Sequence, residues 1–255
     1  MKAAAKILVV TGAGSGMGRQ VALEALRRGA NVAAVDVNES TLAETATLAN
    51  NPDRLSTHVV DITDKPAVAA LPQTVIDRFG AVDGLIHCAG IIQPFVRLKD
   101  LDDAAIDRVF AVNWTGTLNL TRAFLPILLA RPEGHIVNTS SMGGFLPVPG
   151  QTIYGASKAA VKLLTEGLHA ECRGTNVHVT VVFPGAVATN ITTNSGVDIP
   201  ISPEDAEKAA RRTLSADKAA ATILDGTERN AYRVMVGNDA RMMDALYRIN
   251  PSGAA

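Results

Sequence analysis

A tyrosine and a lysine with helical spacing are the side chains best suited to acid–base chemistry in this sequence. In Tyr154-Gly155-Ala156-Ser157-Lys158 the phenol and the ammonium are four residues apart, so a helix would place both on one face. An ammonium near a phenol stabilises the phenolate and lowers the tyrosine pKa from about 10 towards neutral pH. Such a pair can move a proton to or from a substrate oxygen. A solvated helix face is the alternative interpretation, and the pair alone is compatible with both.

A glycine-rich turn near the start of the chain is suited to binding a pyrophosphate. The turn follows the apolar run Lys6–Val10 and precedes a segment with helical periodicity. Glycine lets the backbone come close to a phosphate, and the start of a helix offers unpaired N–H donors and the positive end of its dipole. No Gly-Lys-Ser/Thr sequence follows, which excludes a P-loop. This context predicts a dinucleotide site that includes Gly12, Gly14, Ser15, Gly16, Met17 and Gly18.

An aspartate at the end of the second apolar run indicates which dinucleotide is bound. Asp36 lies 18 residues after Gly18, close to the spacing of a ribose-binding carboxylate. A carboxylate there accepts hydrogen bonds from both adenosine hydroxyls and repels a 2′-phosphate. Neither Ser15 nor Val37-Asn38 carries a positive charge, so the pattern favours NAD over NADP. The alternative for Asp36 is a helix N-cap.

Short β-branched runs alternate with helical segments along the whole chain, and these elements must position the reactive groups. Runs such as Ile7–Val10 and Val32–Val35 are apolar on both faces, which suits parallel strands covered by helices on both sides. The alternation implies right-handed βαβ units in a doubly wound α/β fold. We therefore expect residues 1–255 to form a single domain with a parallel sheet of about seven strands. The predicted strands are Lys6–Val10, Asn31–Val37, Leu55–Val60, Val82–His87, Gly134–Ser140, Val177–Phe183 and Tyr232–Val236.

The helical segments have mostly clear ends. Pro126 predicts a kink or break near the end of the longest one. Met242, Met243, Leu246 and Ile249 form an apolar stripe that more often belongs to a core, although it could cover a subunit contact or a substrate pocket. The predicted helices are Gly16–Gly29, Glu39–Ala49, Lys65–Phe79, Asp102–Ala130, Thr152–Arg173, Pro203–Ser215, Ala216–Glu228 and Arg241–Ile249.

Composition excludes several classes of protein. The 24 Lys and Arg balance 25 Asp and Glu, so we expect no nucleic-acid or anionic-membrane partner. Two cysteines cannot form a disulfide framework, and without CxxC or HExxH patterns we expect no metal site. No apolar run approaches the roughly 18 residues of a membrane span, and the apolar start is broken at Thr11-Gly12. We therefore expect a cytoplasmic protein.

Taken together, the motifs resemble the short-chain dehydrogenase/reductase family. The resemblance runs in order and spacing from about Lys6 to Thr189, and besides the glycine turn and the Tyr-Lys pair it includes Ala89-Gly90, Asn113, Ser141 and Pro184-Gly185. It implies a Rossmann fold and hydride transfer between NAD(H) and a secondary alcohol or ketone. The alternatives are an NADPH-dependent 3-ketoacyl-type reductase, which Asp36 disfavours, and a dinucleotide-binding scaffold without turnover.

The resemblance also assigns catalytic roles. Tyr154 would be the general acid and base, and Lys158 would hold the nicotinamide ribose and depress the Tyr154 pKa. Ser141 would hydrogen-bond the substrate oxygen, and it is preferred to Ser140 because it precedes Tyr154 by 13 residues, as the family's serine does. Asn113 would lie at a helix irregularity and hold a water of the proton relay.

Further cofactor contacts are expected where other strands end. Asp61 and Ile62 could flank the adenine, although Asp61 could equally be a solvated turn residue. The resemblance places the backbone of Cys88, Ala89 and Gly90 along the cofactor, and Pro184, Gly185, Val187 and Thr189 at its nicotinamide end. His87-Cys88 departs from the family's usual Asn-Asn, and we expect His87 to be a hydrogen-bonded structural residue.

Three segments that vary among relatives would form the substrate side of the site. Ile91–Leu98 and Met142–Gln151 are mostly apolar, which favours a weakly polar or apolar substrate. The third, Asn190–Pro203, begins a region that we expect to form a substrate lid over residues 190–215. We also expect a homodimer or homotetramer, with a dimer through the Asp102–Ala130 and Thr152–Arg173 helices as the safer expectation because of the added C-terminal helix.

Overall fold

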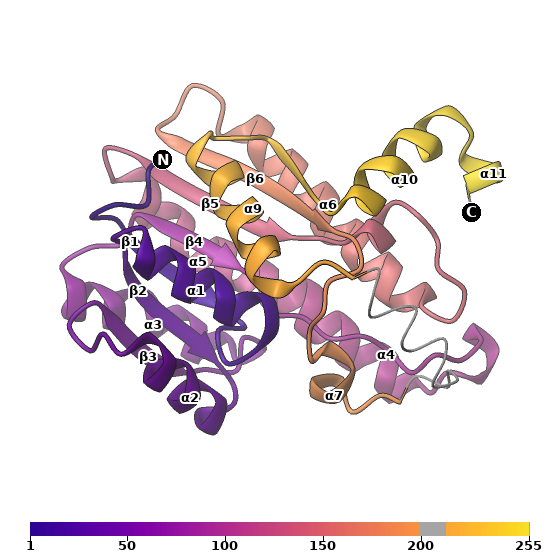
Figure 1. Cartoon of the computed structure of the whole chain (residues 1–255), viewed down its shortest axis with the longest axis horizontal. Helices are drawn as coiled ribbons and strands as arrows, with labels where there is room; N and C mark the ends of the chain where they lie inside the picture. The colour runs from indigo at the N-terminus through magenta and orange to yellow at the C-terminus, as the bar shows by residue number, and fades with distance from the viewer. Residues whose placement is uncertain (199–212, 255) are drawn as a thin grey trace.

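A single parallel β-sheet organises the chain, and the computed structural model describes residues 1–198 and 213–254 of it (Figure 1). Its seven strands have the order β3-β2-β1-β4-β5-β6-β7, and every neighbouring pair is parallel. This confirms the predicted fold class. The strands are β1 (Ile7–Thr11), β2 (Asn31–Asp36), β3 (Leu55–Val59), β4 (Gly84–His87), β5 (Gly134–Thr139), β6 (Val177–Pro184) and β7 (Arg233–Val236).

Helices cover both faces of the sheet because alternate strand residues point to opposite sides. Leu8 and Val10 belong to one apolar core, whereas Ile7 and Val9 belong to the other. The first core is covered by α1 (Gly16–Arg27), α2 (Glu39–Ala49) and α9 (Ala216–Glu228), of which α1 and α9 lie side by side in Figure 1. The second is covered by α3 (Lys65–Phe79), α5 (Thr117–Leu129) and α6 (Thr152–Glu171).

The strand order places the candidate site residues at one edge. From β1 the chain adds β2 and β3 on one side of the sheet, and it then returns to add β4 to β7 on the other side. In such sheets ligands bind beyond the carboxyl ends of the strands at the switch point between β1 and β4. The glycine-rich turn follows β1, Asp36 ends β2, and Cys88 follows β4. All three therefore meet at the same edge.

The predicted helix Asp102–Ala130 is divided, although not at Pro126. It consists of α4 (Asp103–Phe110), the π-helical turn η2 (Ala111–Gly116) and α5. Pro126 lies inside α5. Because proline has no N–H, the carbonyl of Arg122 loses its helical hydrogen-bond donor. Both residues lie on the exposed side of the helix, where water can donate to that carbonyl. The prediction of a break at Pro126 is therefore wrong, and the irregularity lies at η2 instead.

The C-terminal helix α10 (Asn238–Ile249) begins earlier than predicted and exposes its apolar stripe. Met242, Leu246 and Ile249 are 58%, 47% and 82% exposed, so their assignment to a core is wrong. Ala240 is buried and Asp244 pairs with Arg233 of β7 at 3.1 Å, so the opposite side of the helix anchors it. α10 and the short α11 (Pro251–Ala254) extend from the body at the right of Figure 1.

Some sequence predictions fall partly outside the described residues. The structure describes only Thr213–Ser215 of the predicted helix Pro203–Ser215, and only the first part of the predicted lid, where α7 (Ile191–Ser195) is found. Within residues 1–198 and 213–254 no helix combines the length and apolar character needed to cross a membrane. In the same residues no group of three or more His, Cys, Asp or Glu side chains gathers as metal ligands would.

Candidate active site

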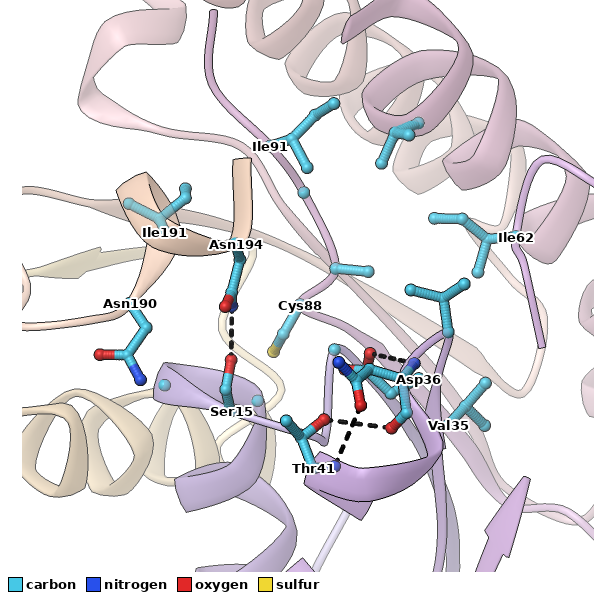
Figure 2. A pocket seen from close by; sticks show the side chains of 18 of the residues that line it. Ser15, Val35, Asp36, Thr41, Ile62, Cys88, Ile91, Asn190, Ile191 and Asn194 are labelled. Atoms are coloured by element: carbon cyan, nitrogen blue, oxygen red, sulfur yellow. Dashed lines mark hydrogen bonds between the residues drawn. The ribbon is translucent and has the colours of Figure 1, made fainter. Parts of the chain in front are cut away.

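A cavity of about 420 Å³ opens at the carboxyl edge of the sheet (Figure 2). Its wall is built from the glycine-rich turn, the ends of β2 and β3, the segment after β4, and parts of α4, η2 and α7. The predicted cofactor residues that line it are Gly12, Ser15, Gly16, Met17, Gly18, Asp36, Asp61, Ile62, Cys88, Ala89, Gly90 and Thr189.

Close backbone contacts explain the glycines of the turn. Gly12 has a φ of +68°, and a Cβ there would lie 2.9 Å from the Ala89 backbone. A Cβ on Gly18 would strike the carbonyl oxygen of Gly12. These glycines therefore allow the strand, the turn and the start of α1 to pack backbone against backbone.

The start of α1 has the features of an anion-binding site. Ser15 is the N-cap of α1, but its side chain does not bond to the N–H groups of the helix. Its hydroxyl instead accepts a hydrogen bond from the Asn194 amide at 2.6 Å, across the mouth of the cavity (Figure 2). The first N–H groups of α1 therefore remain available as hydrogen-bond donors at the positive end of the helix dipole. Both features suit a pyrophosphate.

Asp36 is held in place by backbone N–H groups. One carboxylate oxygen accepts from Gly14 at 2.9 Å and the other from Asn38 at 3.1 Å. Asn38, not Asp36, is the N-cap of α2, where its side chain accepts from Thr41. The N-cap alternative for Asp36 is therefore wrong, and its carboxylate is presented to the cavity as a ribose ligand would require.

Gly14, Pro184, Gly185 and Val187 do not line the cavity as the described residues define it. Gly14 is part of the turn and donates its N–H to Asp36. Gly185 donates its N–H to Val236 and packs against Asp239 of α10, while Val187 forms a bridge with Leu214. Their predicted role at the nicotinamide end stays a prediction.

The end of the cavity beside β3 includes Asp61, which was predicted, and two residues that spacing did not identify. Asp61 accepts two hydrogen bonds from Thr63 at 2.8 Å and is exposed, as a solvated turn residue would be; it also lines the cavity, and its predicted contact with the adenine stays a prediction. Arg108 and Val112 line the cavity as well. Their four-residue separation on consecutive helical turns was the signal that could have identified them.

Two adjacent serines have different partners. The hydroxyl of Ser140 is buried and donates to the carbonyl of Lys158 at 2.7 Å. Ser141 accepts from the Gly143 N–H at 3.0 Å, and its hydroxyl is hydrogen-bonded to Tyr154. The geometry therefore brings Ser141 and not Ser140 to the phenol, in agreement with the choice made from spacing.

Lys158 lies deep in the protein beside the phenol and the cavity wall. Its Nζ donates to the Thr139 carbonyl at 3.0 Å and lies 6.0 Å from the centroid of the Tyr154 ring. A Cβ on the cavity residue Gly90 would come within 3.0 Å of Nζ. The acid–base pair and the cavity therefore adjoin each other through Gly90, although neither Tyr154 nor Lys158 lines the cavity.

The ionisation of this pair differs from the sequence prediction. Burial lowers the pKa of Lys158 to about 8. Burial also raises the pKa of Tyr154, and the hydrogen bond with Ser141 opposes that rise. The expected lowering of the tyrosine pKa is thus wrong for the free protein, because removal of the phenol from water has the largest effect and raises the pKa.

Asn113 lies in the π-helical turn η2, at the kind of helix irregularity that the resemblance implies. Its amide oxygen accepts from the Ile91 N–H at 2.9 Å, and its amide nitrogen donates to the Ile91 carbonyl and to Ser157. Ser157 in turn donates to the carbonyl of Tyr154 at 2.7 Å. The side chain of Asn113 therefore links the segment after β4 to the helix that carries the phenol.

His87 is a structural residue, as predicted. It is fully buried, and its Nδ1 shares a 2.6 Å hydrogen bond with the Thr11 hydroxyl, which also accepts from the Ala89 N–H. Burial lowers the pKa of His87 to about 3, so the ring is neutral at neutral pH and its tautomer decides which of the two groups donates. This contact fixes the end of β4 against the end of β1.

The apolar residues expected around a substrate pack partly against one another. Phe145 contacts Phe183 of β6 and Tyr247 of α10, with ring centroids 5.6 Å and 6.2 Å apart. Ile92 and Leu146 are buried. Sequence analysis missed the part of α10 in this cluster, because Tyr247 is separated from Phe145 by about a hundred residues.

The chain belongs to the short chain dehydrogenase family, whose model matches residues 6–199. The putative oxidoreductase SadH of Mycobacterium tuberculosis is 38% identical over 256 residues, which cover 96% of this chain and 90% of that protein. A short chain dehydrogenase/reductase from Burkholderia phymatum, solved in complex with NAD, has a TM-score of 0.89 at 28% identity and covers 98% of this chain and 95% of its own. Levodione reductase has a TM-score of 0.82 at 30% identity, with 92% and 98% covered. The protein is thus an oxidoreductase of this family.

Replacing His87 by Asn should make the stability of the protein less sensitive to acid. The folded-state pKa of about 3 lies below the ordinary value of 6.5, so the unfolded chain binds the proton first and the free energy of unfolding decreases as pH falls from 6.5 towards 3. At a pH of about 5 this loss is about 2 kcal/mol. Chemical denaturation over that pH range should give a shallower decline for H87N than for the wild type.

The same measurement contains its own control. Above the ordinary histidine pKa of 6.5 both proteins are free of this proton, so their difference there should be constant and reports only the lost contact with Thr11. Equal declines in the two proteins below that pH would contradict a pKa held low by burial.

Proposed function

We propose that the protein transfers a hydride between NAD(H) and a secondary alcohol or ketone. One observation carries this proposal: the hydroxyls of Ser141 and Tyr154 are hydrogen-bonded near the buried ammonium of Lys158, which adjoins Gly90 of a cavity suited to a dinucleotide. A scaffold that only binds a dinucleotide does not need an acid–base group there. The arrangement therefore favours catalysis.

The cavity residues support NAD in preference to NADP. The glycine-rich turn leaves backbone room and free N–H donors for a pyrophosphate, and Asp36 presents a carboxylate where the adenosine ribose would lie. A 2′-phosphate beside Asp36 would meet like charge. Asp36, Gly90 and Thr189 would thus bind the ribose, the central part and the nicotinamide end of the cofactor in turn.

The chemistry divides between the cofactor and three side chains. When bound, the nicotinamide ring takes up or supplies the hydride. In alcohol oxidation Tyr154 receives the hydroxyl proton as phenolate, and in ketone reduction it returns that proton to the developing alkoxide. Ser141 donates a hydrogen bond to the same substrate oxygen. Lys158 stabilises the phenolate with its positive charge and binds the nicotinamide ribose, so each step needs it protonated.

The remaining parts of the proposal concern the substrate and its surroundings. The apolar residues after β4 and around η3 (Met142–Gly144) support a weakly polar substrate. Residues 190–215, which begin with α7 at the cavity mouth, would act as a lid. We also propose a cytoplasmic homodimer or homotetramer, with a dimer through the Asp102–Ala130 tract (α4, η2 and α5) and α6 as the safer expectation.

The substitution Tyr154→Phe tests the proposed reaction. It removes the proton-carrying hydroxyl and should lower kcat by about 10²- to 10⁴-fold, while NADH fluorescence titration should show unchanged cofactor binding. Tyr232→Phe is the matched control, because Tyr232 contacts His169 in the last turn of α6, whereas Tyr154 lies in its first turn, so the variant should keep wild-type turnover. Retained turnover in Y154F would exclude the assigned role.

Cofactor choice can be tested with Asp36→Asn. Asparagine keeps an acceptor for the Gly14 N–H but removes the charge, so kcat/KM with NADP should rise by about tenfold or more, while kcat/KM with NAD should fall. Glu39→Gln, an exposed charge removal on α2, should leave the ratio unchanged. A wild type that already prefers NADP would refute the assignment of Asp36.

The substrate class is accessible through a panel of secondary alcohols assayed with NAD by absorbance at the NADH band. Aliphatic and cyclic alcohols should give higher kcat/KM than polyols, because the side chains around the expected pocket offer apolar surface. A clear preference for polyols, or for substrates carrying phosphate, would show that the apolar residues pack only against one another.

A further inference from the structure

Residues 91–93, which directly follow the cavity residue Gly90, connect three parts of the fold. Ile91 is bonded through both its N–H and its carbonyl to Asn113 in η2. The N–H of Ile92 donates to the Ser195 hydroxyl of α7 at 3.0 Å. Gln93 contacts the start of α6, the helix that carries Tyr154 and Lys158. We call residues 91–93 the connecting strap.

The side chain of Gln93 is hydrogen-bonded to the first turn of α6. Its side-chain oxygen accepts from the N–H of Ile153 at 2.8 Å and from the N–H of Tyr154 at 2.9 Å. The N–H groups in the first turn of a helix have no hydrogen-bond acceptor within the helix. Gln93, which is distant in sequence, therefore caps the start of α6 with its side-chain oxygen. The N-cap residue itself, Gln151, forms no side-chain cap with α6.

Gln93 is held through both its backbone and its side chain. Gln93 is fully buried, and its backbone carbonyl accepts from the Gln151 amide at 2.7 Å. Two side-chain amides thus exchange roles: Gln151 bonds the backbone of the strap, and Gln93 bonds the backbone of α6. The Gln93 Nε2 has no hydrogen-bond partner, but only one orientation of this buried amide presents its oxygen to the two N–H groups, so the position of the strap determines the position of the Tyr154 backbone.

We propose that Gln93 is a positioning residue that sets where Tyr154 stands relative to Ser141 and Lys158. The inference rests on the proposed function, because it assigns Gln93 a part in that reaction. Tyr154 lies in the first turn of α6, where a helix frays most easily, and its own N–H is one of the two bonded groups. Without the bonds, the phenol would sample positions outside hydrogen-bond reach of a substrate oxygen that Ser141 holds.

Two variants separate positioning from general stability. Gln93→Met fills similar space but removes the acceptor, whereas Gln93→Glu keeps the acceptor oxygens and adds a negative charge at the backbone N–H groups of Ile153 and Tyr154. Q93M should lower kcat by about tenfold, with KM for NAD and NADH affinity within about twofold of wild type. Q93E should keep near-wild-type kcat at its own optimum, with a pH profile moved to higher pH because the carboxylate raises the pKa of Tyr154.

Amide hydrogen exchange gives a readout that does not depend on turnover. Q93M should lose protection at Ile153 and Tyr154, while Q93E should keep it. Gln73→Met is the control, because Gln73 is an exposed residue of α3 whose amide bonds Asp77, and it should change neither exchange at α6 nor kinetics.

Each result decides the proposal. Unchanged kcat or unchanged exchange in Q93M overturns it, and so do parallel losses of kcat, NADH affinity and melting temperature, which would indicate a purely structural role. If Q93M does not fold, Q93E decides through its pH profile, and an unmoved profile overturns the proposal. If the wild type oxidises no alcohol with NAD, the proposed function fails, and the exchange data show separately whether Gln93 holds Tyr154.

Discussion

The buried ammonium of Lys158 is the feature on which the candidate site depends. Removing a charged lysine from water is costly, and its pKa of about 8 shows that cost. The Thr139 carbonyl at 3.0 Å offsets part of it. At this pKa the ammonium is mostly protonated at neutral pH but loses its proton just above it, so additional negative charge or a hydroxyl-rich ligand at the site would favour its protonated form. Under the proposed function, ligand binding and activation of the phenol would therefore be coupled through one proton.

Close packing of backbone at the carboxyl edge is what brings that lysine to the cavity. Gly12 against Ala89, Gly18 against Gly12 and Gly90 against Lys158 each lack the space for a Cβ atom. These contacts draw β1, β4 and α6 together at the switch point of the sheet. Gly90, which lines the cavity and lies against Lys158 Nζ, is the residue through which a dinucleotide over the glycine-rich turn would come near the proposed acid–base group.

Periodicity and turn chemistry predicted the fold closely because the strands are apolar on both faces and the helices have distinct ends. The helices α2 and α3 have the predicted bounds, since Asn38 and Asp64 cap their starts and Asn50 and Gly80 their ends. The sequence did not predict the π-helical turn from local preference, because its cause is tertiary: Gly116 packs on Ile62, and Asn113 bonds Ile91. The stripe on α10 misled for a related reason, since an amphipathic pattern shows which residues share a face and not whether anything covers it.

A sequence pattern also does not show which partner each side chain meets in the folded protein. Residue types alone therefore could not separate proposed reacting groups from supporting ones at the site. At the end of β5 successive side chains point to opposite sides, so Ser140 bonds the backbone of α6 while Ser141 faces the phenol. On α6, Ser157 donates to the Tyr154 backbone carbonyl and accepts from Asn113, so its hydroxyl supports the helix. In each case one hydroxyl is hydrogen-bonded to the backbone and the other side chain is left for the role that the proposed function gives it. A hydroxyl held by the backbone could not follow a reacting oxygen, so the proposed reaction would require this division between the two kinds of residue.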